Sequence, residues 1–209
     1  MNPKQFLDFA LLMFRCKCHV RKAWTECRDK DGNIVRHNII GAEPVLGHTG
    51  GVIMLLDLLE YVPAISSTLD MNRVRRLALW HDTLCEYEHG DTNDQHLTDD
   101  PVEKARIKRE KEIRERASVQ KACSGLPDDA AKDLTECWEE YVANETPESI
   151  VAHIFDKDDF LITGLLYLLF GHPIPMDEFL RNHQRTFENP WLTELVKEIE
   201  LRCRQKNAA

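Results

Sequence analysis

Apolar residues recur at the spacing of amphipathic helices along most of the chain, and alternating strand-like stretches are nearly absent. Cap residues and prolines punctuate this pattern, as at Asp70, Thr146-Pro147 and Asn189-Pro190. Helices are predicted over residues 4–18, 45–59, 71–85, 101–121, 127–141, 146–159, 160–170, 176–188 and 190–205. The turn signal Asp31-Gly32-Asn33 predicts a small hairpin between residues 25 and 41. The pattern predicts one all-α domain covering residues 1–209.

One predicted helix ends in a histidine and an aspartate that stand side by side, His81 and Asp82. The spacing places both on an apolar stripe that runs from Val74 to Cys85. Buried polar groups of this kind need partners, because an unpaired buried charge is strongly unfavourable. A divalent cation would satisfy both, since neutral His and ionised Asp are common metal ligands. A core histidine that is hydrogen-bonded to its neighbour is the alternative, and the pair alone does not decide between them.

Four further residues bear on such a site. His48 lies on the apolar face of the helix over 45–59, where a lone histidine is usually a satisfied core residue unless a partner lies elsewhere. Asp156 is the acid closest to the preceding apolar residues in Asp156-Lys157-Asp158-Asp159. Arg21 and Trp24 form either a surface cation–π pair or an anion hook beside a ring that stacks on a base.

Composition excludes several classes of protein. With 209 residues and a formal net charge of −9, the chain can bury a substantial core and is too acidic for generic binding to nucleic acid or an anionic membrane. Its seven cysteines follow no framework spacing, which indicates reduced thiols. We see no signal peptide, and the apolar run 160–170 is shorter than the ~20 residues that span a bilayer. We therefore expect a cytoplasmic protein.

The order of the motifs, a His, a His-Asp pair and a later Asp on three helices, resembles the HD-domain metal-dependent phosphohydrolases, and in finer detail their 5′-deoxynucleotidase branch. Each motif is weak alone, and their shared order over most of the chain makes the match specific. The resemblance implies a single helical HD domain with a core over about 4–172 and a helical tail over about 176–205. The matching segments are Arg21-Lys22-Ala23-Trp24, Glu43-Pro44-Val45-Leu46-Gly47-His48, His81-Asp82 with Glu86 and Gly90-Asp91, and Asp156-Lys157.

The resemblance also implies a divalent metal ion (Mn, Co, Fe, Zn or Mg), whose ligands would be His48, His81, Asp82 and Asp156. Glu86 would be the catalytic acid–base group that orients water or carries a proton. Arg21 would hold the phosphate, Trp24 would pack against base or sugar, and Asp91 would accept a sugar hydroxyl. The expected reaction is hydrolysis of a deoxyribonucleoside 5′-monophosphate to deoxynucleoside and phosphate.

Other functions stay open on the sequence alone. The chain could be an HD nucleoside triphosphohydrolase, a hydrolase of another small phosphate ester, or a non-catalytic HD scaffold that binds a nucleotide. Leftover apolar side chains at both chain ends, together with the resemblance, suggest a homodimer, with closure of the monomer's own core as the alternative. These side chains are Phe6, Phe9, Phe179, Leu180 and Trp191.

The sequence departs from the family pattern in two places. The family's Glu stands where this chain has Cys85, and the acid, Glu86, comes one residue later. An added residue in a helix rotates all later side chains by roughly 100° unless a π-bulge absorbs it. The segment between Trp24 and Glu43 is also longer than expected, so the resemblance says least about the pocket rim and the choice of substrate.

Overall fold

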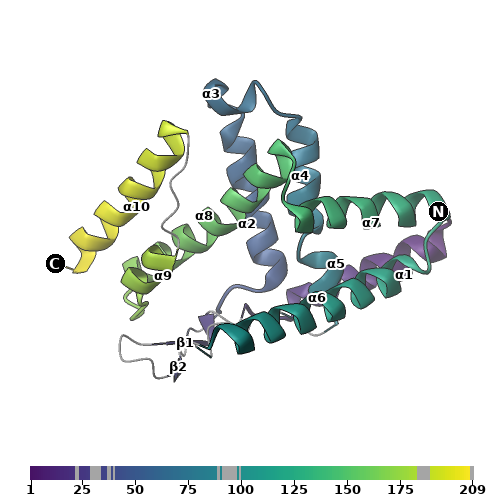
Figure 1. Ribbon diagram of the computed structural model, residues 1–209, viewed down its shortest axis with the longest axis horizontal. Coiled ribbons are helices and arrows are strands. Elements are labelled where there is room, and N and C mark those ends of the chain that lie inside the picture. Colours follow the sequence, from purple (N-terminus) through teal and green to yellow (C-terminus); the bar gives the residue numbers. More distant parts are fainter. Residues whose placement is uncertain are drawn as a thin grey trace.

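The structure is a computed structural model that describes residues 1–21, 24–28, 34–36, 39, 41–88, 90, 98, 100–182 and 189–207. It confirms the predicted all-α fold, to which the predicted hairpin adds two short strands (Figure 1). The elements are α1 (Pro3–Phe14), a 3-10 turn (Arg15–Lys17), β1 (Glu26–Arg28), β2 (Ile34–Arg36), α2 (Val45–Leu59), α3 (Pro63–Ser66), α4 (Met71–Trp80), α5 (Thr83–Glu86), α6 (Pro101–Cys123), α7 (Asp128–Ala143), α8 (Pro147–Leu169), α9 (Met176–Asn182) and α10 (Pro190–Asn207).

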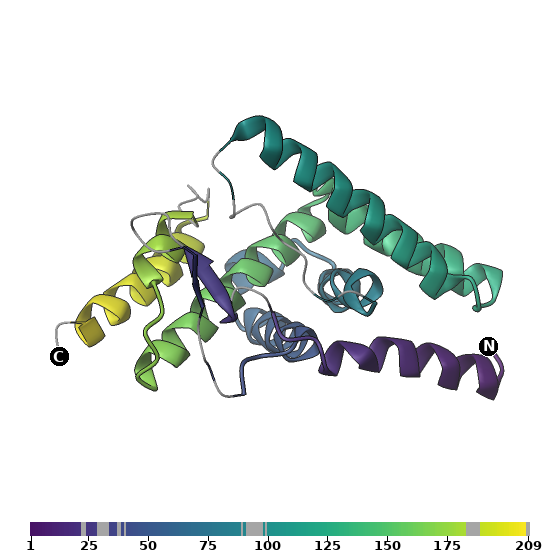
Figure 2. The same ribbon diagram turned by 90° about the horizontal axis from the view of Figure 1, so that it is seen from below.

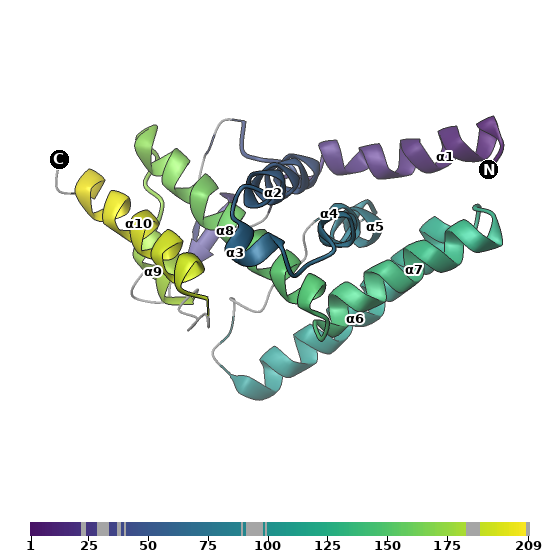
Figure 3. The same ribbon diagram turned by 90° about the horizontal axis from the view of Figure 1, so that it is seen from above.

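Helix α8 is the central element, and most of the long helices pack around it. Its first half contacts α2, α4 and α7, and its second half contacts α9 and α10. Helix α6 lies on α7 and on the short α5. Views from below and above show α1 at the end that carries the N-terminus and α10 at the opposite end (Figures 2 and 3). The middle of α8 is thus enclosed by elements from distant parts of the sequence.

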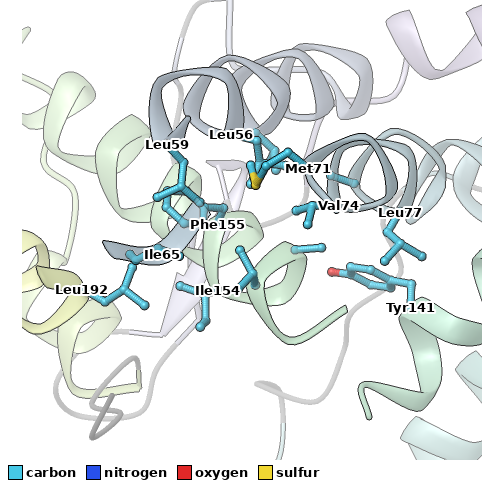
Figure 4. Close-up of a cluster of buried hydrophobic side chains, with 14 of the residues drawn as sticks. Leu56, Leu59, Ile65, Met71, Val74, Leu77, Tyr141, Ile154, Phe155 and Leu192 are labelled. Carbon is cyan, nitrogen blue, oxygen red and sulfur yellow. The ribbon is translucent and has the colours of Figure 1, made fainter. Parts of the chain in front are cut away.

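An apolar cluster joins the three helices on which the predicted metal ligands lie. Figure 4 shows side chains of α2, α4 and α8 directed at one another around this cluster. Its labelled members include Leu56, Leu59, Met71, Val74, Leu77, Ile154 and Phe155. Burial of each such side chain stabilises the fold by about 1.5–3 kcal/mol relative to exposure, so the cluster fixes these helices relative to one another.

Two predicted helix starts are confirmed with their caps. The hydroxyl of Thr146 accepts a hydrogen bond from the backbone N–H of Ser149, and the Ser149 hydroxyl accepts one from the N–H of Thr146. The carboxylate of Asp70 accepts from the N–H groups of Asn72 and Arg73. Both arrangements satisfy backbone donors that have no partner within their own helix, as the sequence led us to expect.

The single helix predicted over residues 71–85 is wrong, because α4 ends at Trp80 and α5 begins only at Thr83. Side chains take two of the carbonyls that a continuing helix would need. The ring of His81 donates to the carbonyl of Ala78 at 2.6 Å, and the hydroxyl of Thr83 donates to that of Leu79 at 2.7 Å. Local side-chain bonds of this kind compete with helical backbone bonds and interrupt the helix at His81.

The apolar run 160–170 is not a separate helix, because α8 runs without interruption from Pro147 to Leu169 and joins this run to the helix predicted over 146–159. Its buried side chains pack against α9 and α10, so the predicted burial is confirmed. Among the residues that the structure describes, we find no helix with the length and apolar character needed to cross a bilayer. The run is therefore explained by packing within the fold.

Candidate metal centre

The fold brings together the four predicted metal ligands from three places in the chain. His48 comes from α2, His81 and Asp82 from the break after α4, and Asp156 from α8. Nε2 of His48 lies 3.0 Å from Oδ1 of Asp156 and 3.7 Å from Oδ2 of Asp82. Nε2 of His81 lies 3.0 Å from Oδ2 of Asp82 and 3.7 Å from Oδ1 of Asp156. Two nitrogens and two oxygens thus face one another.

Both imidazoles are held so that a lone pair faces this cluster. Nδ1 of His81 lies 2.6 Å from the carbonyl oxygen of Ala78, which can only accept, so Nδ1 carries the proton of the neutral ring. Nδ1 of His48 lies 2.6 Å from Oδ2 of Asp159 and donates to it for the same reason. The remaining nitrogens, Nε2 of both rings, are buried and make no hydrogen bond within the described part of the chain.

Two lone pairs and two carboxylate oxygens in contact repel one another unless a positive charge lies among them. Mixed nitrogen and oxygen donors of this kind fit a divalent cation such as Mn²⁺, Co²⁺, Fe²⁺ or Zn²⁺. The ligand atoms of His48, His81 and Asp82 all lie within 4.8 Å of one another, and Asp156 completes the set through its contacts with both rings. The geometry therefore fits the predicted metal ion.

The pKa shifts of the candidate ligands also indicate that the cluster favours a positive charge. Burial and the Arg21 guanidinium lower the pKa of His48, but its contacts with the carboxylates of Asp156 and Asp159 outweigh them and raise it to about 9. Burial alone would raise the pKa of Asp82 and of Asp156, yet the adjoining histidines and Arg21 hold both well below the ordinary range. The carboxylates thus favour a positive charge at the centre of the cluster, which a divalent cation would supply.

The site is open on its carboxylate side. The side chains of Asp82 and Asp156 keep 18% and 19% of their surface exposed, whereas those of His48 and His81 keep 0% and 2%. A small ligand can therefore approach the carboxylates from solvent while the imidazoles stay fixed in the core.

Arg21 lies beside the partly exposed carboxylate of Asp82. Its guanidinium contacts Oδ2 of Asp82 at 3.2 Å, and its backbone N–H donates to the carbonyl of Glu43 at 3.0 Å. The neighbouring N–H of Val45 donates to the carbonyl of His19, so a short backbone pairing fixes Arg21 to the start of α2. Of the two interpretations of Arg21, the structure favours a side chain directed at the site over a surface pair with Trp24.

The structure differs from the prediction at Trp24. This side chain is fully buried, with its ring stacked on Phe160 at 4.6 Å between centroids and edge contacts to Tyr167 and Phe179. Its indole N–H donates to Oε2 of Glu43 at 3.4 Å. In this arrangement no ring face is available to a base, because aromatic packing against α8 and α9 has taken the place of substrate stacking.

Glu86 is buried in α5, and its backbone N–H donates to the carbonyl of Asp82 at 2.8 Å. Burial raises the pKa of the Cys16 thiol to about 12, and the carboxylates of Glu86 and Asp82 add to this rise. On the α6 side, burial lowers the pKa of Lys111, but Glu115 and Glu86 outweigh it and raise it. The ammonium of Lys111 pairs with Glu115 at 2.8 Å. The role of Glu86 as catalytic acid stays a prediction, and the predicted sugar-binding Asp91 lies outside the described residues.

Cys85, which occupies the family's acid position, is turned into the core rather than towards the ligands. Its thiol donates to the carbonyl oxygens of His81 at 3.2 Å and Asp82 at 3.5 Å. Burial, reinforced by nearby carboxylates, raises the pKa of this thiol well above its ordinary value. A protonated thiol is neither a good nucleophile nor a metal ligand, so Cys85 supports the break in the helix instead.

Sequence reasoning missed two buried side chains that hold the ligands in place, Asp159 and Tyr141. Asp159 holds His48 as described above, and the Tyr141 hydroxyl donates to Oδ2 of Asp156 at 3.1 Å. A signal for Asp159 was present, because positions 156 and 159 share one face of a helix.

Comparison with known proteins gives matches over most of the chain. Residues 28–188 match the family model described as HD domain. Human 5′-deoxynucleotidase HDDC2 is 29% identical over 200 residues, which cover 95% of this chain and 86% of the human protein. The protein of the same name from Dictyostelium discoideum is 23% identical over 202 residues, which cover 93% of this chain and 96% of that protein.

Solved structures show the same fold. The crystal structure of a predicted metal-dependent phosphohydrolase from Magnetospirillum magnetotacticum superposes with a TM-score of 0.67 at 20% identity and covers 98% of this chain and 93% of that one. A protein from Pyrococcus horikoshii superposes with a TM-score of 0.66 at 20% identity, over 94% of this chain and 99% of that one.

Proposed function

The chain belongs to the HD domain family of metal-dependent phosphohydrolases, and from this premise we propose that it hydrolyses deoxyribonucleoside 5′-monophosphates to deoxynucleoside and phosphate. The observation that carries the proposal is the convergence of two imidazole lone pairs and two ionised carboxylates beside Arg21. The choice of substrate rests on the relatives named 5′-deoxynucleotidase, which match nearly the whole chain.

In this proposal, His48, His81, Asp82 and Asp156 would hold the divalent metal ion. When bound, such an ion lowers the pKa of coordinated water and polarises a phosphate oxygen. The buried imidazoles fix the position of the site, and the partly exposed carboxylates leave room for the substrate. The sequence and the donor set admit Mn, Co, Fe, Zn or Mg as the metal.

Arg21 would bind the phosphate group. Its planar guanidinium can hold two phosphate oxygens at once, and its backbone is already fixed by the pairing with Glu43. Its present contact with Asp82 places the cation beside the ligand cluster, so a phosphate bound there would lie between the two. Phosphate binding would thus use the positive charge of Arg21, which the folded chain already holds in place.

Glu86 would move the proton. A buried carboxylate near Asp82 suits the task of orienting water and passing a proton to the leaving sugar oxygen. A charge interaction with the Lys111 ammonium of α6 fits a buried carboxylate in this position. Asp91 stays the predicted acceptor for a sugar hydroxyl, while Trp24 is assigned to support of the pocket through Glu43 and Phe160.

A phosphate-release screen tests the proposal against its alternatives. Metal-stripped protein would be reconstituted with Mn²⁺, Co²⁺, Fe²⁺, Zn²⁺ or Mg²⁺ and offered deoxynucleoside mono- and triphosphates, ribonucleotides and other small phosphate esters. We expect release of inorganic phosphate from deoxynucleoside monophosphates. Turnover of triphosphates alone would indicate a triphosphohydrolase, turnover of non-nucleotide esters alone another phosphatase, and metal binding without turnover a nucleotide-binding scaffold.

Two variants distinguish the loss of the metal site from general destabilisation of the protein. Asp82→Ala should lose both bound metal and activity, because it removes a ligand oxygen and the partner of Arg21. Asp8→Ala on the exposed surface of α1 is the matched control and should keep both. Equal metal content in Asp82→Ala and wild type would contradict the assignment.

A further inference from the structure

We propose that Asp159 and Gly51 form a positioning pair for His48, in which Asp159 holds the imidazole and Gly51 provides the space that the Asp159 carboxylate occupies. The inference rests on the proposed metal site and adds two residues that act on the metal through His48. Neither residue touches the metal ion itself in this arrangement.

The contact between Asp159 and His48 is short and fully enclosed. Oδ2 of Asp159 lies 2.6 Å from Nδ1 of His48, and both side chains are buried. An ionised carboxylate only accepts hydrogen bonds, so the proton of the neutral ring must lie on Nδ1. The lone pair is then on Nε2, the atom that faces Asp156 and Asp82. Asp159 thereby selects the tautomer and the ring orientation that a metal ion requires.

The same contact argues against a second metal ion. The ligand atoms of Glu43, His48 and Asp159 also lie within 4.8 Å of one another, which is close enough to hold a cation. However, the Asp159 oxygen nearest to His48 already accepts the Nδ1 proton. A cation there would have to replace that proton, and His48 would then bridge two metals. We therefore assign Asp159 to the support of the metal ligand.

Gly51 explains how a carboxylate fits beside α2. A Cβ atom at position 51 would lie 2.1 Å from Oδ1 and 3.0 Å from Cγ of Asp159, which is closer than atoms can approach. Position 51 is three residues after His48 and lies on the same face of α2. Glycine is disfavoured in the middle of a helix relative to alanine, so its presence here has a packing reason.

The adjacent Gly50 provides an internal comparison. It is exposed, and a Cβ built at position 50 has no neighbouring atom within 4 Å. The two glycines are consecutive in one helix, yet only Gly51 borders the carboxylate that holds His48. Replacement of each by alanine therefore makes the same chemical change in the same helix with different consequences for the site.

The test measures the affinity for Co²⁺ of the full chain, with the metal alone as the probe. Metal-stripped wild type, Asp159→Asn, Gly51→Ala and Gly50→Ala would be titrated with Co²⁺ in competition with a chromophoric chelator, and helical content would be followed by circular dichroism. Asn keeps the shape of Asp159 and can still accept from Nδ1, but it lacks the charge. Loss of such a supporting contact typically lowers metal affinity 10–100-fold.

We expect Asp159→Asn and Gly51→Ala each to bind Co²⁺ about 10–100-fold more weakly, and Gly50→Ala to bind it like wild type. The double variant should be little weaker than the weaker single variant, because both changes act on one contact. Phosphate release by both single variants should recover at saturating Co²⁺, which a general folding defect would not allow. If Gly51→Ala does not fold, Asp159→Asn decides the question alone.

Wild-type affinity in Asp159→Asn would overturn the inference, as would equal weakening in Gly50→Ala and Gly51→Ala. The proposed substrate can fail separately: weakened Co²⁺ binding in a protein that releases no phosphate from deoxynucleotides would leave the positioning pair intact. Absence of Co²⁺ binding by the wild-type cluster would overturn both.

Discussion

The phenol of Tyr141 donates a hydrogen bond of 3.1 Å to Oδ2 of Asp156, while Oδ1 of the same carboxylate lies 3.0 Å from Nε2 of His48. The two oxygens of Asp156 thus make different contacts: Oδ2 accepts from the tyrosine of α7, and Oδ1 faces the other candidate metal ligands. Burial, with the charge of Asp156 next in importance, raises the pKa of Tyr141 well above its ordinary value. The phenol therefore remains protonated and can only donate to the carboxylate.

Tyr141→Phe should weaken the metal site without removing a ligand. The lost hydrogen bond lets the Asp156 carboxylate rotate, so we expect Co²⁺ affinity to fall by about 10-fold or more. The free energy of unfolding should fall by about 1.5–3 kcal/mol, the usual contribution of a hydrogen bond to a charged group. Tyr61→Phe makes the same change at a side chain that is 85% exposed, and it should alter neither quantity. Unchanged Co²⁺ binding in Tyr141→Phe would contradict this role.

Glu86→Gln should lower kcat by about 10²–10⁴-fold on deoxynucleoside monophosphates, because general acid–base help is typically worth that much. Metal content should stay the same, since Glu86 is not among the four ligands. Glu88→Gln is the control, because Glu88 is two residues away and pairs with Lys121 at the surface. Full activity in Glu86→Gln would show that the acid has been lost from this site or that Glu88 replaces it.

Cys85→Ala should cost little activity but some stability. The thiol carries no charge at neutral pH and bonds only the backbone of His81 and Asp82 among the described residues. Its removal leaves a small cavity beside the helix break, so thermal unfolding should shift downward by a few degrees while kcat changes less than a few-fold. A loss of activity as large as that of Glu86→Gln would assign the catalytic position to Cys85.

The four candidate metal ligands could be singled out from the sequence because their signals are local and ordered. His48, His81-Asp82 and Asp156 follow one another in the order of the family, and the caps at Asp70 and Thr146 set the helix starts. The break at His81 could not be predicted, because it depends on which carbonyls the ring and Thr83 reach in the folded chain.

Tertiary contacts decide the features that the sequence left open. The family resemblance assigned Trp24 to the substrate, but in space its aromatic partners are Phe160, Tyr167 and Phe179, which lie more than 130 residues away. Asp159 stands in a run of acids in which only the packing of α8 against Gly51 shows which one reaches Nδ1 of His48. Sequence spacing shows on which face of its helix a residue lies, but the partner of that residue comes from another helix.

Of the five apolar side chains that the sequence offered for a homodimer, Phe6 and Trp191 are exposed in the structure. Phe9 and Leu180 are partly buried and Phe179 is buried, so they help to close the monomer's own core. Exposed apolar side chains gather instead on α1, where four are 53–65% exposed: Phe6, Leu7, Leu11 and Phe14.

Light scattering at micromolar concentration should give about twice the monomer mass of 24.3 kDa if a second copy covers α1. Phe6→Ser with Leu11→Ser should then shift the protein towards the monomer. Met54→Ser on the exposed side of α2 is the control and should leave the mass unchanged. A mass near 24 kDa for wild type would rule the dimer out.

His153 should make the metal-free protein less stable in mild acid. Its ring stacks on Tyr141 at 3.8 Å, its Nε2–H donates to the Tyr141 carbonyl at 2.8 Å, and burial lowers its pKa. The unfolded chain, with a His pKa of about 6.5, therefore takes up the proton more readily than the folded chain as the pH falls. From pH 6.5 downward the free energy of unfolding should decrease, by at most about 1.4 kcal/mol per pH unit for this one group.

His153→Gln keeps a donor but does not titrate, so the free energy of unfolding of this variant should fall less between pH 7 and 5. Between pH 7.5 and 8.5 the stability curves of the variant and of wild type should run parallel. Chemical denaturation in the presence of a chelator measures both curves, and parallel curves below pH 6.5 as well would contradict the assignment.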